Sequence, residues 1–167
     1  MYKFFGFFII AIFITACGYK PSANYANEVL GDKIHVEVEI SRKDPKNSVL
    51  IKDAVNESVI TRLGGKLSLK ESADAELYVK IGSTTFSAIL YDTDGYVVAY
   101  KAKVLLKIKY ITRDGKKESF STSGEYDFPV KADSVISDTN RFEAIKFASL
   151  DALNEFISKI AIKGIKK

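Results

Sequence analysis

The most constraining feature of the sequence is the stretch AYKAKVLLKIKY at residues 99–110, in which charged and apolar residues alternate. Successive side chains of a β-strand point to opposite faces of a sheet, so this alternation predicts a strand with one apolar and one basic face. At about 3.4 Å per residue, the basic face extends over about 27 Å. It carries four lysines: Lys101, Lys103, Lys107 and Lys109.

Three further strands are predicted around this one. Residues 33–40 alternate in the same way and form the first strand. Residues 75–91 form a long second strand, whose apolar phase shifts near Gly82 and therefore predicts a β-bulge. The turn sequences DTDG and RDGK then join the second strand to the lysine strand, and the lysine strand to a fourth one in KESFSTSGEYDFPV.

The RDGK turn sets the register between the third and fourth strands. A two-residue turn at Asp114 and Gly115 would mix apolar and polar residues on each face of the sheet. A three-residue loop with a left-handed Gly115 instead pairs Thr112 with Lys116. We choose the second register, because a slip of one residue would bury the charges. The lysines then face the serines of the fourth strand: Ser119, Ser121 and Ser123.

Two segments carry apolar residues at helical spacing. The first, PKNSVLIKDAVNESVITRLGG, has Asn47 or Ser48 as its N-cap and stops at Gly64. The second, at about 140–163, begins with the capping-box pair Asn140 and Glu143 and continues as a long amphipathic helix.

The order strand, helix, three strands, helix predicts an α+β fold. We expect a two-layer sandwich in which two helices cover one face of a four-stranded, mostly antiparallel sheet. Residues 33–163 would form this single domain, followed by a basic tail at 164–167. The lysines lie on the uncovered face.

The amino terminus predicts export and a lipid anchor. Residues 1–16 contain one lysine and then an apolar run that is short for a membrane span, the pattern of a signal peptide. Cys17, the single cysteine, follows in ITAC, which looks like a bacterial lipobox; Gly18 in place of an aspartate favours the outer membrane. Residues 17–32 have Pro21, Gly31 and small polar residues, which predict a flexible leash after the lipidated cysteine.

Several function classes are disfavoured by the sequence. A net charge of +4, without a recognisable nucleic-acid-binding motif, is too small for a nucleic-acid binder. His35, Glu37 and Glu39 share one face of the first strand, but they diverge by about 7 Å per step, and no second histidine or further cysteine supports a metal site. The chain also has no Gly-x-Ser-x-Gly motif. We therefore expect no enzymatic activity, no metal and no cofactor.

Taken in order, several motifs resemble one family. They are CGYKPS at the lipobox, ADAEL at the start of the second strand, YDTDGYVVAYKAKVLLKIKY at the hairpin and GEYDF near the end of the fourth strand. Together they resemble the LPS-assembly lipoproteins, LptE, over nearly the whole mature chain. The resemblance implies a lipid-anchored plug on the periplasmic side and in the lumen of the outer-membrane β-barrel LptD, which helps that barrel assemble and assists delivery of lipopolysaccharide to the cell surface.

The resemblance gives the basic face a possible ligand. Lipopolysaccharide presents phosphates and sugar carboxylates, and the four lysines on an open face could meet them as point charges. Alternatively, the lysines only keep the face solvated. Glu125 and Asp127 could pair with them toward one end.

The YDTDGY hairpin is the second candidate site. We expect it to contact the barrel through Tyr91, Asp92, Thr93, Gly95 and Tyr96, because exposed loop tips often serve recognition. Some relatives carry a basic residue near this tip and another before the last helix; here Thr93 and Ser137 stand at about these places, so those family sites are not transferred.

Two other functions remain open from the sequence. The chain could be an auxiliary or structural lipoprotein of another envelope transport system. A periplasmic hydrolase is the third reading, and it lacks candidate residues.

Overall fold

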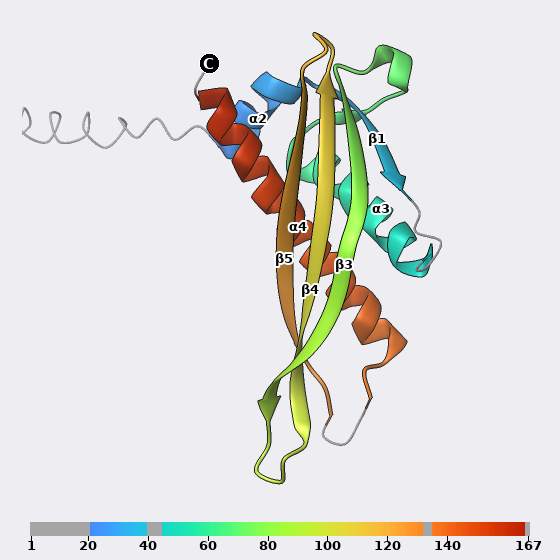
Figure 1. The fold of residues 1–167 in the computed structure, drawn as a ribbon, viewed down its shortest axis with the longest axis vertical. Coiled ribbons are helices and arrows are strands. Elements are labelled where there is room, and N and C mark those ends of the chain that lie inside the picture. Colours follow the sequence, from blue (N-terminus) through green and yellow to red (C-terminus); the bar gives the residue numbers. More distant parts are fainter. Residues whose placement is uncertain (1–20, 40–44, 132–134, 166–167) are drawn as a thin grey trace, which may run out of the picture.

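The computed structural model describes residues 21–39, 45–131 and 135–165 as one sheet with helices on one side (Figure 1). The sheet has the strand order β2-β1-β3-β4-β5. Its strands are β1 Lys33–Glu39, β2 Lys66–Leu67, β3 Ala75–Tyr91, β4 Val97–Thr112 and β5 Lys117–Pro129. The helices are α2 Ser22–Leu30, α3 Pro45–Thr61 and α4 Asp138–Ile165, with a short 3-10 turn, η1, at Lys70–Ser72.

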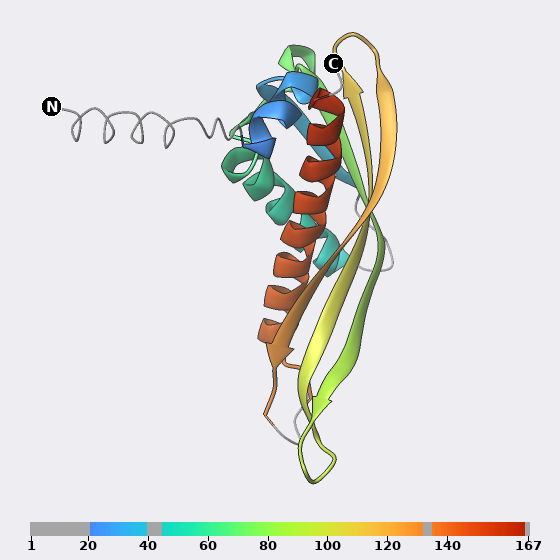
Figure 2. The ribbon, with the colours of Figure 1, turned by 90° about the vertical axis from the view of Figure 1, so that its left-hand side faces the viewer.

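The predicted α+β class and its two layers are confirmed. Figure 2 shows the helices on one side of the sheet, while no described element covers the other side. Strands β3, β4 and β5 form an antiparallel meander, whereas β1 runs parallel to β3. The sheet is therefore mixed, and the short strand β2 makes it five-stranded instead of four-stranded.

The predicted turn and bulge are also confirmed. Gly115 is left-handed, with φ 81°, and the Thr112 N–H donates to the Lys116 carbonyl at 2.9 Å. The β3–β4 pairing shifts register between Ile81 and Ser83, around the predicted bulge at Gly82. The register that the turn sets places Lys107 and Lys109 opposite serines of β5, as predicted. The third serine, Ser123, was also predicted to face a lysine, but it lies opposite Leu105.

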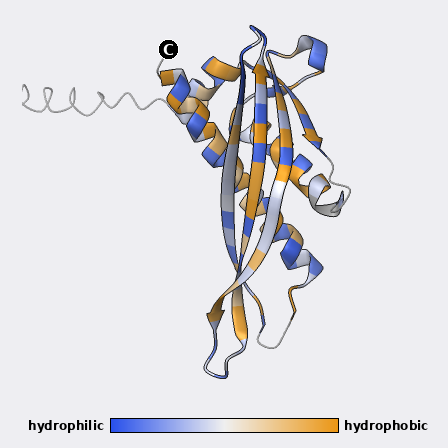
Figure 3. Ribbon diagram, viewed as in Figure 1, coloured by the Kyte–Doolittle hydropathy of each residue, from blue (hydrophilic) through white to orange (hydrophobic). Residues whose placement is uncertain are grey.

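The core lies between the sheet and the helices. Figure 3 shows hydrophobic and hydrophilic residues alternating along β4, as the sequence predicts. From Ala102 to Tyr110 the apolar row of β4 is buried under α4, whose own buried stripe faces it. The largest buried side chains of this interface include Leu106, Ile108, Tyr110, Ile145, Leu153, Phe156 and Ile160.

Three local predictions were wrong. Residues 22–30 form helix α2 instead of part of a flexible leash, with Ala26 and Leu30 buried against the core. Helix α3 already begins at Pro45, so neither Asn47 nor Ser48 is its N-cap. Helix α4 begins at Asp138, so Asn140 lies inside the helix and is not its cap. The backbone N–H of Asn140 instead donates to the Ser137 hydroxyl at 3.1 Å.

None of the described helices is long and apolar enough to cross a membrane. The predicted signal peptide, the predicted lipid anchor Cys17 and residues 166–167 of the predicted basic tail at 164–167 lie outside the described residues, while residues 164–165 end helix α4.

Helix α4 covers the outer edge of β5. An edge strand exposes a row of unpaired backbone groups. Here three side chains of α4 bind such groups: Glu155 accepts from the Ser123 N–H (2.7 Å), Asp151 accepts from the Glu125 N–H (3.0 Å), and Lys159 donates to the Ser121 carbonyl (3.0 Å). This edge is therefore closed along its centre.

Gly124 lies where the helix and the strand approach most closely. A Cβ atom at Gly124 would lie 2.1 Å from the Ala148 carbonyl oxygen and 2.2 Å from the Ala152 nitrogen, both backbone atoms of α4. Backbone atoms of a packed helix cannot rotate away as a side chain can. A residue with no side chain is required at this position.

We predict that Gly124→Ala destabilises the protein by about 2–3 kcal/mol, the upper part of the usual overpacking cost, because α4 must move away from β5. Urea denaturation measures this loss. Gly82→Ala is the matched control: its Cβ would meet the flexible side chain of Leu105 at 2.9 Å and the nearest backbone atom, the Leu105 carbonyl oxygen, only at 3.2 Å, so it should cost clearly less. Equal losses in the two variants would contradict this account of the β5–α4 contact.

Candidate functional site

The four predicted lysines project together from β4 on the face that the helices leave open. Their β4 neighbours of the opposite parity are buried, while Lys103, Lys107 and Lys109 are exposed and Lys101 is partly exposed. Leu105 stands between the two pairs of lysines, beside the bulge at Gly82. The basic row is therefore divided into two halves.

The first half of the row is neutralised. The register places Lys103 opposite Glu125 and Lys101 opposite Asp127. Both ammonium groups bind the same carboxylate: the Lys101 and Lys103 Nζ atoms lie 2.7 and 2.9 Å from Glu125, and Lys101 also lies 3.6 Å from Asp127. Two cations here face two anions, which leaves this half with little net charge.

The titration of these groups reflects the same contacts. Hydrogen bonds from Lys101 and Lys103 lower the pKa of Glu125 to about 2. The hydrogen bond to Glu125, followed by the charge of Asp127, raises the pKa of Lys101. Glu125 and Lys101 are therefore both ionised throughout the neutral range.

The second half of the row keeps its charge. Among the described residues, neither Lys107 nor Lys109 forms an ion pair. Their β5 neighbours are Ser121 and Ser119, which supply hydroxyl groups and no charge. On the β3 side, Lys107 lies directly opposite Lys80, which adds a third ammonium group.

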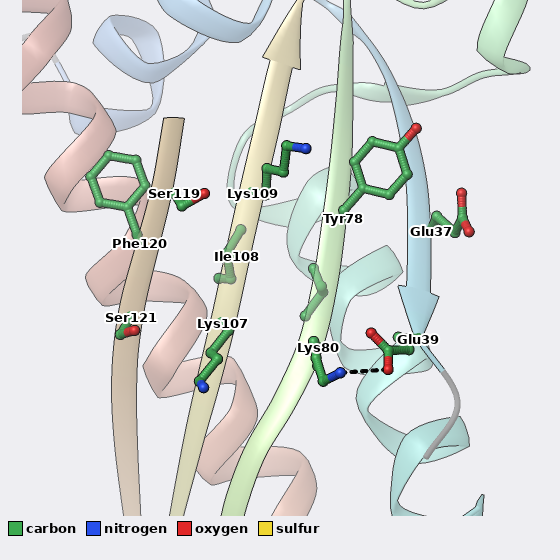
Figure 4. Close-up of a pocket in the computed structure, with 11 residues that line it drawn as sticks. Glu37, Glu39, Tyr78, Lys80, Lys107, Ile108, Lys109, Ser119, Phe120 and Ser121 are labelled. Carbon is green, nitrogen blue, oxygen red and sulfur yellow. Dashed lines mark hydrogen bonds and ion pairs between the residues drawn. The ribbon is translucent and has the colours of Figure 1, made fainter. Parts of the chain in front are cut away.

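These residues line a shallow hollow of about 510 Å³ on the sheet face. Figure 4 shows Lys107 and Lys109 between Tyr78 and Lys80 of β3 on one side and Ser119 and Ser121 of β5 on the other. Glu37 and Glu39 of β1 stand at the far rim. The hollow combines ammonium and hydroxyl groups, a chemistry that suits phosphate or carboxylate groups.

Two contacts shape the rim of this hollow. Glu39 holds Lys80 in an ion pair of 2.6 Å, which partly neutralises the third lysine. The Tyr78 hydroxyl donates to Glu76 and accepts from Lys70 of η1, so it is held by its neighbours. Three lysines and two glutamates, Glu37 and Glu39, line the hollow, so its formal net charge is +1, and Lys107 and Lys109 are the lysines without an ion pair among the described residues.

The predicted hairpin tip is a separate feature at one end of the molecule. The Asp92 carboxylate accepts the N–H groups of Asp94 (3.0 Å) and Tyr96 (2.8 Å), and Gly95 is left-handed with φ 86°. Tyr91 and Tyr96 remain 58% and 48% exposed on this ordered turn. Figures 1 and 2 show the tip extending beyond the helix layer.

The structure does not bring the predicted site residues into one site. The tip ends at Tyr96, and β4 then extends ten residues from Val97 to Lys107, a distance of roughly 33 Å. Within the predicted row, Lys107 and Lys109 share a hollow, whereas Lys101 and Lys103 belong to the Glu125 cluster. Cys17, the predicted anchor, lies outside the described residues.

Sequence reasoning missed the β1 and β3 contributions to the hollow. Lys80, Tyr78, Glu37 and Glu39 meet there because β1 pairs in parallel with β3, Glu39 opposite Lys80. The alternation of each strand signals which face its residues occupy, but no local signal sets a parallel register between distant segments. His35, on the same face of β1, lies with its Nδ1 atom 3.1 Å from the Ser68 carbonyl oxygen.

Comparison with solved structures identifies the class of fold. A putative lipoprotein from Caulobacter crescentus is 8% identical, with 87% of this chain and 97% of that chain covered and a TM-score of 0.53. A Xanthomonas campestris protein is 11% identical, with 81% and 86% covered and a TM-score of 0.52. At these identities the likeness shows the fold alone, an α+β domain also found in a bacterial lipoprotein. No curated protein matches the chain.

The family follows from a match to its sequence model. Residues 35–160 match the model of LptE, described as lipopolysaccharide-assembly. This range includes the whole β3–β5 meander and most of α4. The chain therefore belongs to the LptE family and is an LPS-assembly lipoprotein.

We predict that the pKa of Glu125 depends on the first pair of lysines and not on the second. In Lys101→Gln/Lys103→Gln the pKa should rise from about 2 toward the ordinary value of 4.5, because both hydrogen-bonded cations are gone. In Lys107→Gln/Lys109→Gln, the matched control with the same loss of charge, it should stay at about 2. Carboxyl NMR titration measures both.

The pKa of Glu125 is depressed in the folded state, so its contribution to stability is present above pH 4.5 and is lost as the pH falls toward 2. An unchanged titration in Lys101→Gln/Lys103→Gln would show that the Glu125 contacts do not form in solution.

Proposed function

We propose that this protein is the outer-membrane plug of an LptD-type β-barrel, where it helps the barrel assemble and assists lipopolysaccharide transport to the cell surface. It would be held to the membrane by a lipid on Cys17 and would face the periplasm and the barrel lumen. Its role would be binding and not catalysis. Its partners would be the barrel and lipopolysaccharide, with no nucleic acid involved.

The observation that supports direct lipid binding is the uneven neutralisation of the lysine row. If the lysines only kept the face solvated, acids could pair with all of them at no cost to the fold. Instead, Glu125 holds Lys101 and Lys103, while Lys107 and Lys109 form no ion pair among the described residues, although Glu37 and Glu39 stand at the rim of their hollow. This hollow is where phosphate groups of lipopolysaccharide would bind.

The hairpin tip supports the barrel contact. Beyond the two tyrosines, Ile89 and Leu90 near the tip are also exposed, by 41% and 57%. Exposed aromatic and aliphatic side chains on an ordered turn are typical of protein interfaces. The tip also projects past the helices, where a barrel wall could reach it (Figure 1).

The other functions have less support. An auxiliary lipoprotein of another transport system would share the fold, but the family match favours lipopolysaccharide assembly. A hydrolase would need a nucleophile with a base; the described part of the chain contains one histidine, His35, which lies beside a backbone carbonyl.

We predict that Lys107→Gln/Lys109→Gln weakens binding of purified lipopolysaccharide by roughly 2- to 30-fold, because each exposed ion pair contributes up to about 1 kcal/mol. Lys101→Gln/Lys103→Gln is the matched control and should change the affinity much less, since those lysines already bind Glu125. Fluorescence titration measures both, after circular dichroism has shown that each variant folds.

Salt gives a second readout. Binding by the wild type should weaken with added salt, because exposed charges are screened over about 8 Å at physiological ionic strength. Equal affinities for the two double variants, with no salt dependence, would make the row a solvated face.

We predict that a photo-crosslinking residue at Thr93 captures the barrel in cells. Thr93 is exposed at the centre of the tip, so its side chain can be replaced without loss of packing. The product should be a large outer-membrane protein, identified by mass spectrometry after detergent extraction. Crosslinks from Ser158 on the exposed side of α4, with none from Thr93, would contradict this placement of the tip.

A further inference from the structure

The two long edges of the sheet are treated differently by the fold. The β5 edge is closed by side chains of α4, as described above. On the other side, β1 pairs with β3 only as far as Glu39 and Lys80. Beyond this point β3 continues to Tyr91, and among the described residues it pairs there with β4 alone.

We call Gly82–Tyr91 the free edge. All of its residues are exposed or partly exposed. Its sequence, GSTTFSAILY, contains no lysine, arginine, aspartate, glutamate or proline. Natural sheets usually protect an open edge with such residues, because its unpaired backbone groups can bind another strand. The free edge has register shifts near Leu90, but no charge along ten residues.

We propose that the free edge binds an extended β-segment of alternating polarity, the chemistry of a transmembrane barrel strand, before that segment enters a closed barrel. The backbone groups of β3 would hydrogen-bond to the segment and extend the sheet by one strand. This inference rests on the proposed function, because it gives the mechanism by which the plug would help a barrel to assemble.

The side chains of the free edge match such an occupant. Ser83, Thr85 and Ser87 lie on the lysine face of the sheet, since they pair with Leu105, Lys103 and Lys101. The alternate residues lie on the core face and include Phe86, which packs against the core. The free edge therefore has one hydroxyl-bearing side and one more apolar side, and a barrel strand likewise alternates polar and apolar residues.

Length and charge point to the same occupant. A transmembrane β-strand has about 9–11 residues, and the free edge has a similar length. The lipid-facing residues of a barrel strand are uncharged, so they need no charged partner on the strand beside them. The free edge offers none. A closed barrel has no edge to offer, which restricts this binding to a strand that is not yet built in.

The experiment uses the full-length chain, purified in detergent, and a labelled ten-residue peptide that alternates valine with threonine. A peptide of the same composition, with the valines and threonines in separate blocks, is the control ligand. Fluorescence anisotropy gives the affinity, and hydrogen-exchange mass spectrometry locates the bound segment. We expect the alternating peptide to bind more tightly and to slow amide exchange in Gly82–Tyr91.

Charged variants test the edge itself. Thr85→Lys/Ser87→Lys should weaken peptide binding at least roughly fivefold, because lysine side chains on an edge oppose strand addition. Thr61→Lys/Ser158→Lys is the matched control: it adds the same charge at exposed threonine and serine residues on helices, away from β3. It should leave the affinity unchanged. Ser87→Lys alone serves if the double variant does not fold.

Four outcomes would overturn the proposal: no peptide binding, equal binding of both peptides, equal losses in both double variants, or slowed exchange outside the free edge. Protection of the free edge without peptide, in a concentration-dependent dimer, would also overturn it and assign the edge to a second copy of this chain. The Thr93 crosslink separates this test from the proposed function: a captured barrel without peptide binding rejects the strand addition alone.

Discussion

The structure depends on the alternation of apolar and charged residues along β4. This strand lies at the centre of the β3–β5 meander, and its apolar row is buried under α4 while its lysines face outward. A shift of one residue would bury four ammonium groups, each at a desolvation cost that the core could not offset. The alternation thus decides which face of the sheet the helices cover and which face is open for binding.

The turn at Arg113–Lys116 then decides the electrostatics of the open face. Because Gly115 adopts the left-handed conformation, β5 pairs with β4 in the register that places Glu125 beside Lys101 and Lys103. Further along, the same register places serines beside Lys107 and Lys109. One backbone conformation therefore separates a neutralised pair of lysines from a charged pair.

Much of this arrangement could be predicted from the sequence, because it follows from local signals. The meander, the bulge at Gly82, the left-handed Gly115 and the partial pairing of the lysine row each depend on alternation or turn chemistry within one hairpin. Helix α2 escaped prediction because its nine residues are too few for the spacing of Ala26, Val29 and Leu30 to stand out; it packs against α4, where the Tyr25 backbone meets Gly164. The rim of the hollow escaped for a similar reason: the Glu39–Lys80 contact joins residues that are 41 positions apart.

The difference in length between β1 and β3 links the two sites with the open edge. Had β1 extended along all of β3, it would have covered both the free edge and the approach to the tip. Because β1 ends at Glu39, the first half of β3 builds the rim of the basic hollow, while the second half continues past β1 in a three-stranded arm with β4 and β5. A two-stranded hairpin alone is marginally stable in water. Here β5 adds a third strand as far as Ala99, and Ala102 and Val104 are buried, so the arm can project an uncharged edge and aromatic side chains and still keep an ordered tip.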